Sequence, residues 1–240
     1  MRIVAIDLGK FKSVVCDYDS ENGEHKFRTL RSQPQEIHDL LVEYEPGRVV
    51  IETGKQTGWV YDLATALGIE VQVANTNHDI WRWNMNTTKT DRSDALKLAR
   101  LSALGQLPQA HIPSQEVRQW RSLIEYRHSL VERRTAIKNS IRAILEKEGI
   151  AWPSSRAGWS MKSMERLGKL SQTLGDREDE SLWQGQLGVE LVLLESVEKA
   201  LSAVTAKLDK IGTWKKAVKL PAYAGPDSAR GEPIYIAHIA

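Results

Sequence analysis

The sequence has few of the features that mark secreted, zinc-binding or membrane-embedded proteins. Cys16 is the only cysteine among 240 residues, which excludes an intramolecular disulfide framework and a multi-cysteine zinc site. The first apolar run ends at Asp7, and no apolar stretch is long enough to span a bilayer or to form the core of a secretory signal. We therefore predict a globular, cytoplasmic protein that has no membrane partner.

Charge of one sign is also not in large excess, since the formal net charge is +2. The distribution is uneven, however: residues 82–142 contain twelve Lys and Arg against five Asp and Glu, and the rest of the chain is net acidic. Such an asymmetry is typical of a protein that binds a polyanion. A solvated helix with many salt bridges gives the same count, so both interpretations stay open.

The first 76 residues alternate between strand and helix patterns. Three apolar or alternating segments come first, with turn residues between them, and helical spacing alternates with buried-strand runs after that. Strands joined first by hairpins and then separated by helices predict an α/β domain with a mixed sheet. The predicted strands are 2–7, 12–18, 24–30, 48–51 and 70–74, and the predicted helices are 35–44 and 58–67.

Two long helices are predicted after residue 115, because leucine and isoleucine recur there at seven-residue intervals. They suit an antiparallel coiled-coil hairpin or a dimer seam, and a plain helical bundle fits the pattern equally well. The weakly patterned segment between them, from 152 to about 185, is predicted to be a connector. The repeating residues are Leu123, Leu130, Ile137 and Ile144 in the first helix and Leu187, Leu194, Leu201 and Leu208 in the second.

Four carboxylates occupy positions suited to metal chemistry. Asp7 and Glu52 each end an apolar strand, while Asp91 and Asp94 are three residues apart at the predicted start of a helix and so share one helix face. Carboxylates that converge from two strands and a helix can hold two Mg²⁺ ions for phosphodiester cleavage. The alternative is that acids in a first helical turn merely favour the helix start.

Four ordered motifs resemble the DEDD transposases of the insertion-sequence 110 family, the bridge-RNA-guided recombinases. They are Ala5-Ile6-Asp7-Leu8-Gly9-Lys10, Val50-Ile51-Glu52-Thr53-Gly54, Lys89-Thr90-Asp91-Arg92-Ser93-Asp94-Ala95, and a basic segment from Tyr126-Arg127 through Arg133-Arg134-Thr135 to Lys138-Asn139. The resemblance covers about residues 2–211. It implies a RuvC-like (ribonuclease H-like) domain at 1–110, a helical coiled-coil region at 111–211 and the start of a C-terminal transposase domain at 212–240.

The resemblance also implies an activity, namely Mg²⁺-dependent, RNA-guided DNA transposition by an insertion sequence. Asp7, Glu52, Asp91 and Asp94 would be the catalytic and metal-binding residues. DNA and a guide (bridge) RNA would be the partners, and the long helices would assemble a homo-oligomer.

The chain departs from the family pattern near its end. Members carry a nucleophilic serine in a Ser-Gly-Gly-like setting of the C-terminal domain, and no such setting is present, so Ser228 stays unassigned. We therefore expect a truncated chain. The alternative function is a catalytically inactive fragment that only binds nucleic acid or a full-length partner.

Two further function classes match part of the sequence. A RuvC-type junction resolvase fits the acids alone but does not explain the long heptad helices. An actin-like kinase would match Asp7-Leu8-Gly9, yet a second glycine-rich phosphate loop and an adenosine motif are not found in the sequence.

Three cations of the first long helix, Arg127, Arg134 and Lys138, share a face displaced from its apolar stripe, with Arg121 nearby, and such a row can follow a phosphate backbone. A solvated helix face is the alternative. Trp81 and Trp83 are candidates for base stacking or for core packing. The predicted nucleic-acid-binding residues are Arg121, Arg127, Arg134 and Lys138.

Overall fold

The computed structural model describes residues 1–76, 90–176 and 181–212, and the chain divides into two compact units, the first ending at Arg118 and the second beginning at Gln119. Trp81 and Trp83 lie outside the described residues, as does the predicted C-terminal segment from 213 onward. Among the helices of the described ranges, none is long and apolar enough to cross a membrane.

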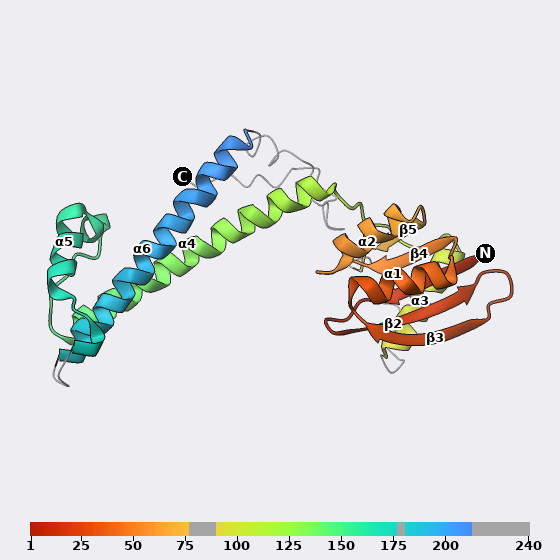
Figure 1. Ribbon diagram of the computed structural model, residues 1–240, viewed down its shortest axis with the longest axis horizontal. Helices are drawn as coiled ribbons and strands as arrows, with labels where there is room; N and C mark the ends of the chain where they lie inside the picture. The colour runs from red at the N-terminus through yellow and green to blue at the C-terminus, as the bar shows by residue number, and fades with distance from the viewer. Residues whose placement is uncertain (77–89, 177–180, 213–240) are drawn as a thin grey trace. The chain divides into compact units, whose positions relative to one another are not determined.

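The first unit contains a five-stranded mixed sheet with the strand order β3-β2-β1-β4-β5 (Figure 1). Strand β1 pairs antiparallel with β2 and parallel with β4, while β2–β3 is antiparallel and β4–β5 is parallel. The predicted α/β class with a mixed sheet is therefore confirmed. The strands are β1 Arg2–Asp7, β2 Lys12–Asp19, β3 His25–Arg31, β4 Arg48–Glu52 and β5 Glu70–Ala74.

Helices cover both faces of this sheet, and the alternation of side chains along β1 shows which face is which. Val4 and Ile6 belong to a core cluster with the buried residues of α1 (Pro34–Tyr44) and α2 (Thr57–Ala66). Ile3 and Ala5 belong to a second cluster with the buried residues of α3 (Asp91–Ala103). The sheet is thus enclosed between two apolar layers, and α3 alone packs on the second face among the described helices.

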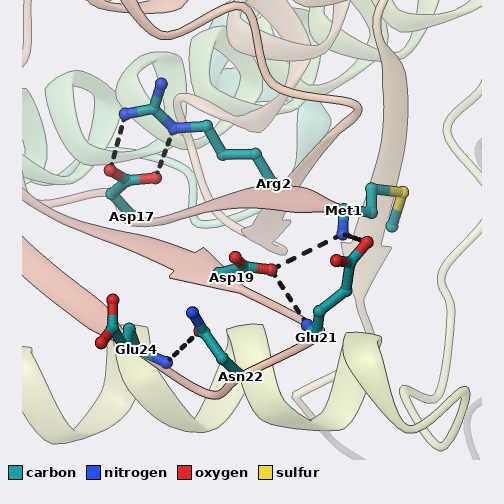
Figure 2. A network of polar contacts seen from close by, with 7 residues as sticks. All are labelled: Met1, Arg2, Asp17, Asp19, Glu21, Asn22 and Glu24. Carbon is teal, nitrogen blue, oxygen red and sulfur yellow. Dashed lines mark hydrogen bonds and ion pairs between the residues drawn. The ribbon is translucent and has the colours of Figure 1, made fainter.

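Hydrogen bonds and ion pairs connect polar residues at the end of the sheet where β1 begins (Figure 2). The Arg2 guanidinium donates two hydrogen bonds to the Asp17 carboxylate, both of 2.7 Å, and the N-terminal amine lies 3.0 Å from the Glu21 carboxylate. Because β1 runs away from this network, Asp7 stands at the opposite end of the sheet.

The second unit is built on two long helices, α4 (Gln115–Lys147), whose first turn belongs to the first unit, and α6 (Leu182–Lys210). Lys138 contacts Glu198 at 3.4 Å and Arg127 contacts Thr205 at 3.1 Å, so residue numbers rise along one helix as they fall along the other. The helices therefore form an antiparallel pair. The heptad set predicted for α6 is confirmed as a buried stripe made of Leu187, Leu194, Leu201 and Leu208.

The predicted connector is wrong in part, because it contains α5 (Met161–Leu170) flanked by short 3-10 helices, Arg156–Trp159 and Leu174–Asp176. Leu167 is fully buried among the residues of α4 and α6. Met164, Leu167 and Leu170 recur every three residues and pack against this core, so the segment does carry a helical pattern, although a short one. The connecting segment is thus part of the helical core.

The buried stripe of α4 also differs from the predicted heptad. Leu130 is buried as expected, and so is Leu145, one of the apolar residues that accompany the predicted repeat, but Ile141 is also fully buried, while Ile137 and Ile144 are only partly buried. These buried residues lie toward the end of α4 that packs against α5 as well as α6, so a two-helix heptad does not describe their surroundings.

Candidate metal and nucleic-acid site

Asp7 and Glu52 stand at the ends of two neighbouring parallel strands. Ile6 of β1 is in register with Ile51 of β4, and the two acids are the next residue of each strand. Both acids are half-buried, and both make interactions within the chain. The strand register therefore brings these two predicted site residues side by side.

The two acids also belong to the sheet face that α3 covers. Asp7 is in phase with Ala5, and Glu52 is in phase with Val50, and both of these small or apolar residues belong to the core cluster of α3. Glu52 is moreover in register with Ala74, which belongs to the same cluster. The strands consequently direct both acids toward the side of the sheet on which Asp91 and Asp94 begin their helix.

Helix α3 begins with a reciprocal cap that fixes its first turn. The Thr90 hydroxyl accepts a hydrogen bond from the Ser93 backbone N–H at 3.2 Å, and the Ser93 hydroxyl accepts one from the Thr90 N–H at 3.1 Å. Asp91 and Asp94 lie within this turn, where the helix dipole favours carboxylates. Asp91 is exposed and Asp94 is half-buried.

The direction of α3 follows from the contacts of its last turn. The Arg48 guanidinium, at the start of β4, lies 3.4 Å from the Ser102 hydroxyl. The helix therefore runs antiparallel to β1 and β4. Its first turn lies toward the end of the sheet at which Asp7 and Glu52 stand. All four predicted acids belong to one face of the sheet.

Hydrogen bonds join the loops that follow Asp7 and Glu52, a feature that the sequence analysis missed. The Gln56 side-chain amide donates to the Gly9 carbonyl at 2.8 Å, and the Ser32 hydroxyl donates to the same oxygen at 2.6 Å. The Thr57 hydroxyl donates to the Glu52 carbonyl at 2.7 Å. The spacing of these polar residues in the sequence does not reveal their hydrogen-bond partners, because the tertiary fold brings the partners together.

The donor chemistry of the four acids fits a hard divalent cation, since Mg²⁺ and Mn²⁺ prefer carboxylate oxygens. Within residues 1–76, 90–176 and 181–212, however, no three His, Cys, Asp or Glu side chains are grouped closely enough to hold a metal ion. The metal site at Asp7, Glu52, Asp91 and Asp94 accordingly stays a prediction that rests on strand register and helix placement.

The four predicted nucleic-acid-binding cations of α4 differ in their surroundings. Arg121 is exposed, whereas Arg127, Arg134 and Lys138 are half-buried. The Arg127 guanidinium donates to the Thr205 hydroxyl, and the Lys138 ammonium lies 4.8 Å from the centre of the Trp159 ring as well as next to Glu198.

Arg127 and Arg134 line a groove of about 500 Å³ between α4 and α6. Acidic and hydroxyl side chains of α6 share this groove with them, so it is not a purely basic surface. The remaining lining residues are Val131, Glu198, Leu201, Ser202, Thr205, Ala206 and Asp209. Binding of nucleic acid by the four cations stays a prediction.

Arg118 is a further residue that no motif in the sequence distinguishes. Its guanidinium forms an ion pair with Asp62 of α2, donates to the Pro113 carbonyl at 2.6 Å, and lies against Gly58. A side chain at residue 58 would place Cβ 3.0 Å from the Arg118 Nε atom. These contacts connect the first turn of α4 to α2.

These features define an α/β protein with an acidic sheet edge and a helical second unit. The family model DEDD_Tnp_IS110, described as a transposase, matches residues 4–149, which is more than half of the chain. The chain therefore belongs to this DEDD transposase family.

Two curated relatives agree with this assignment. The chain is 28% identical over 170 residues to the putative transposase y4qE of Sinorhizobium fredii, covering 68% of this chain and 43% of the relative. It is 26% identical over 151 residues to the transposase for insertion sequence element IS1111A of Coxiella burnetii, covering 62% and 40% respectively. The chain thus spans less than half the length of these relatives.

Among solved structures, the chain is similar to Thermus thermophilus RuvC in complex with a Holliday junction substrate, with 14% identity, 46% of this chain and 99% of that chain covered, and a TM-score of 0.33. A second Thermus thermophilus RuvC structure gives 16% identity, 46% and 100% coverage and a TM-score of 0.31. Both TM-scores are low, so the family assignment rests on the sequence match.

Proposed function

We propose that this chain acts in DNA transposition by an insertion sequence, as a Mg²⁺-dependent and RNA-guided transposase or recombinase. The observation that carries the proposal is the pairing of Asp7 with Glu52 at the ends of adjacent parallel strands, on the sheet face where α3 begins with Asp91 and Asp94. Membership of the DEDD transposase family supports the same reaction class.

Asp7, Glu52, Asp91 and Asp94 are the residues that would hold the metal. Bound Mg²⁺ would lower the pKa of an attacking water or hydroxyl and stabilise the leaving oxygen of a scissile phosphodiester. The protein's own contribution is to keep four carboxylates on rigid elements at one sheet edge. Gln56 and Ser32 assist by holding the loop that follows Asp7.

Calorimetric titration with Mg²⁺ or Mn²⁺ tests the metal site directly. Asp7→Asn and Glu52→Gln preserve side-chain size and remove one negative charge each, so each should weaken metal binding at least tenfold, and the double variant should abolish it. Glu24→Gln is the matched control, because Glu24 is exposed at the opposite end of the sheet, next to Asn22 (Figure 2).

The result that contradicts this proposal is wild-type metal affinity in the double variant. If the double variant also binds DNA as the wild type does, and DNA binding by the wild type does not respond to Mg²⁺, the chain is a non-catalytic nucleic-acid-binding protein instead.

The DNA, RNA and oligomer parts of the proposal have separate tests. Arg121, Arg127, Arg134 and Lys138 are the proposed phosphate contacts, and the α4–α6 pair is the proposed assembly element. RNA that co-purifies with the protein should be of one dominant sequence, and its removal by ribonuclease should abolish sequence-specific DNA binding. Sedimentation analysis should give a species larger than one 27.1 kDa chain. Random cellular RNA contradicts the guide, and a monomer at all concentrations contradicts the assembly.

A further inference from the structure

Phe11 is an aromatic residue that takes no part in the core of the first unit. It lies in the loop between β1 and β2, and 74% of its surface is exposed to solvent. The chain contains only two phenylalanines, and the other, Phe27, packs partly against the α3 core cluster. A ring this exposed contributes little to stability by burial and is accessible to a binding partner.

The backbone that carries Phe11 is held in place by hydrogen bonds from two other segments. The Ser32 backbone N–H donates to the Phe11 carbonyl at 3.0 Å. Gln56 donates to the carbonyls of Gly9 and Lys10, at 2.8 and 3.4 Å. A Cβ at Gly9 would collide with the Lys12 carbonyl, so the tight turn requires glycine. Phe11 is therefore presented on a fixed loop.

A lysine lies against Phe11, and two more are exposed in neighbouring segments. The Lys10 ammonium lies 4.9 Å from the centre of the Phe11 ring, Lys12 is exposed at the start of β2, and Lys55 is exposed in the connection that follows β4. A protein partner of ordinary interface chemistry would need apolar neighbours around such a ring. An exposed aromatic ring among lysines instead has the chemistry of a stacking platform for a nucleic-acid strand.

The loop follows Asp7 directly, and its hydrogen-bond partner Gln56 follows Glu52 by four residues. Phe11 thus stands at the end of the sheet at which the two acids end their strands. A strand whose phosphates approach the acids would bring its neighbouring bases within the reach of this loop.

We propose that Phe11 stacks on an unpaired base of the DNA strand that the acidic edge acts on, and that Lys10 contacts an adjacent phosphate. This inference rests on the proposed function and deepens it by identifying how the substrate strand is held. It assigns Phe11 a binding role that depends on an unstacked base and requires no base-specific hydrogen bond.

Fluorescence anisotropy with a labelled 20-nucleotide single-stranded DNA and the matching duplex tests the proposal on the full chain. Phe11→Ala should weaken single-strand binding by about 5- to 150-fold, the range expected for the loss of one stacked base. Phe11→Leu keeps an apolar side chain without a π face and should weaken binding similarly, whereas Phe11→Trp should retain it. Duplex binding should change less than twofold.

The matched control is Leu104→Ala. Leu104 is 68% exposed and directly follows α3, the helix whose last turn contacts the start of β4, so it lies at the opposite end of the sheet. A second measurement uses single-stranded DNA that contains 5-iodouracil, whose photocrosslink should map by mass spectrometry to the peptide that contains Phe11.

Equal single-strand affinities for Phe11→Ala, Leu104→Ala and the wild type would overturn the stacking role and leave the proposed function intact. Weakened binding of an RNA strand of the same sequence, with DNA binding unchanged, would also overturn it. If the wild type binds neither single-stranded nor duplex DNA in the presence of Mg²⁺, the proposed function itself fails together with this inference.

Discussion

The side-chain amide nitrogen of Gln56 lies 2.8 Å from the carbonyl oxygen of Gly9. This hydrogen bond connects the loop that follows Glu52 to the loop that follows Asp7, across 47 residues of sequence. The sheet edge that carries Asp7 and Glu52 is therefore stabilised by this hydrogen bond between two loops, in addition to the backbone hydrogen bonds between β1 and β4.

Removal of this contact should loosen the edge without unfolding the sheet. Gln56→Leu leaves the Gly9 carbonyl with its hydrogen bond from Ser32 only, and we expect a loss of stability of about 1 kcal/mol together with faster amide exchange in the loop after β1. Hydrogen-exchange mass spectrometry is the measurement. Gln35→Leu removes an exposed hydrogen bond to Asp39 on α1 and should leave that loop unchanged. Equal exchange in both variants would show that Gln56 is not a support.

Much of the fold could be predicted from the sequence because its signals are local. The strand and helix patterns of the first 76 residues lie within one or two residues of the observed elements, since alternation and helical spacing are set by which face each side chain buries. The side-by-side position of Asp7 and Glu52 was also accessible, because parallel strands end at the same sheet edge.

What escaped prediction depends on contacts between distant segments. Gln56 and Ser32 meet at Gly9 only after the sheet has formed, and no spacing in the sequence reveals it. Helix α5 is a different case, because Met164, Leu167 and Leu170 have local helical spacing, and the short segment was nevertheless predicted as a connector. The half-burial of Arg127 likewise depends on Thr205 of the partner helix.

Burial of Cys16 predicts a stability change at alkaline pH. Burial raises the pKa of its thiol to about 11, with the nearby Asp17 contributing and Arg100 opposing. In the unfolded chain the thiol titrates near its ordinary value of 9.0, so the folded state binds the proton more tightly. The resulting stabilisation is present below pH 9 and is lost as pH rises from 9 to 11, and it amounts to about 2–3 kcal/mol.

Denaturant unfolding of the wild type and of Cys16→Ala at several pH values from 8 to about 11 measures this effect. The stability difference between the two proteins should shrink across this window. At pH values below this window, the Cys16 thiol of the native protein should resist alkylation and become reactive on unfolding, because the thiolate is the nucleophile and the side chain is buried. A constant stability difference, or rapid alkylation of the native protein at pH 8, would contradict the prediction.

Packing between α4, α5 and α6 predicts a large difference between two aliphatic residues of the same helix. Leu194 is 1% exposed in the core that includes Ile141 and Leu167, whereas Val192 is 66% exposed. Leu194→Ala should destabilise the second unit by about 2–5 kcal/mol, because it leaves a cavity, and Val192→Ala should change stability by less than about 0.5 kcal/mol. Thermal unfolding followed by circular dichroism distinguishes them, and similar melting temperatures for the two variants would contradict the packing described for α6.

The basic residues of α4 predict a specific salt dependence of DNA binding. Each phosphate contact contributes a slope of about −0.9 to the logarithm of the binding constant against the logarithm of salt concentration. Replacement of all four proposed contacts by glutamine should therefore flatten the slope by about 3 to 4, and weaken binding on DNA of every sequence. The residues are Arg121, Arg127, Arg134 and Lys138.

The control for this variant must remove the same net charge elsewhere in the second unit. Four exposed lysines serve, and their replacement by glutamine should change the slope by less than about 1, because they are not on the proposed face. Circular dichroism checks that both variants keep the helix pair, since Arg127 and Lys138 also contact Thr205 and Glu198. The control residues are Lys147, Lys162, Lys169 and Lys199.

Single replacements then distinguish the exposed cation from the half-buried cations among these four residues of α4. Arg121 is exposed, so Arg121→Gln should flatten the slope by about 0.9 and leave stability unchanged. The Arg127 side chain is hydrogen-bonded to Thr205, so Arg127→Gln should lower stability and flatten the slope only if the guanidinium also reaches a phosphate from the groove between α4 and α6. An unchanged slope in Arg127→Gln with reduced stability would assign that residue to the helix pair, and an unchanged slope in the quadruple variant would remove α4 from the DNA-binding surface altogether.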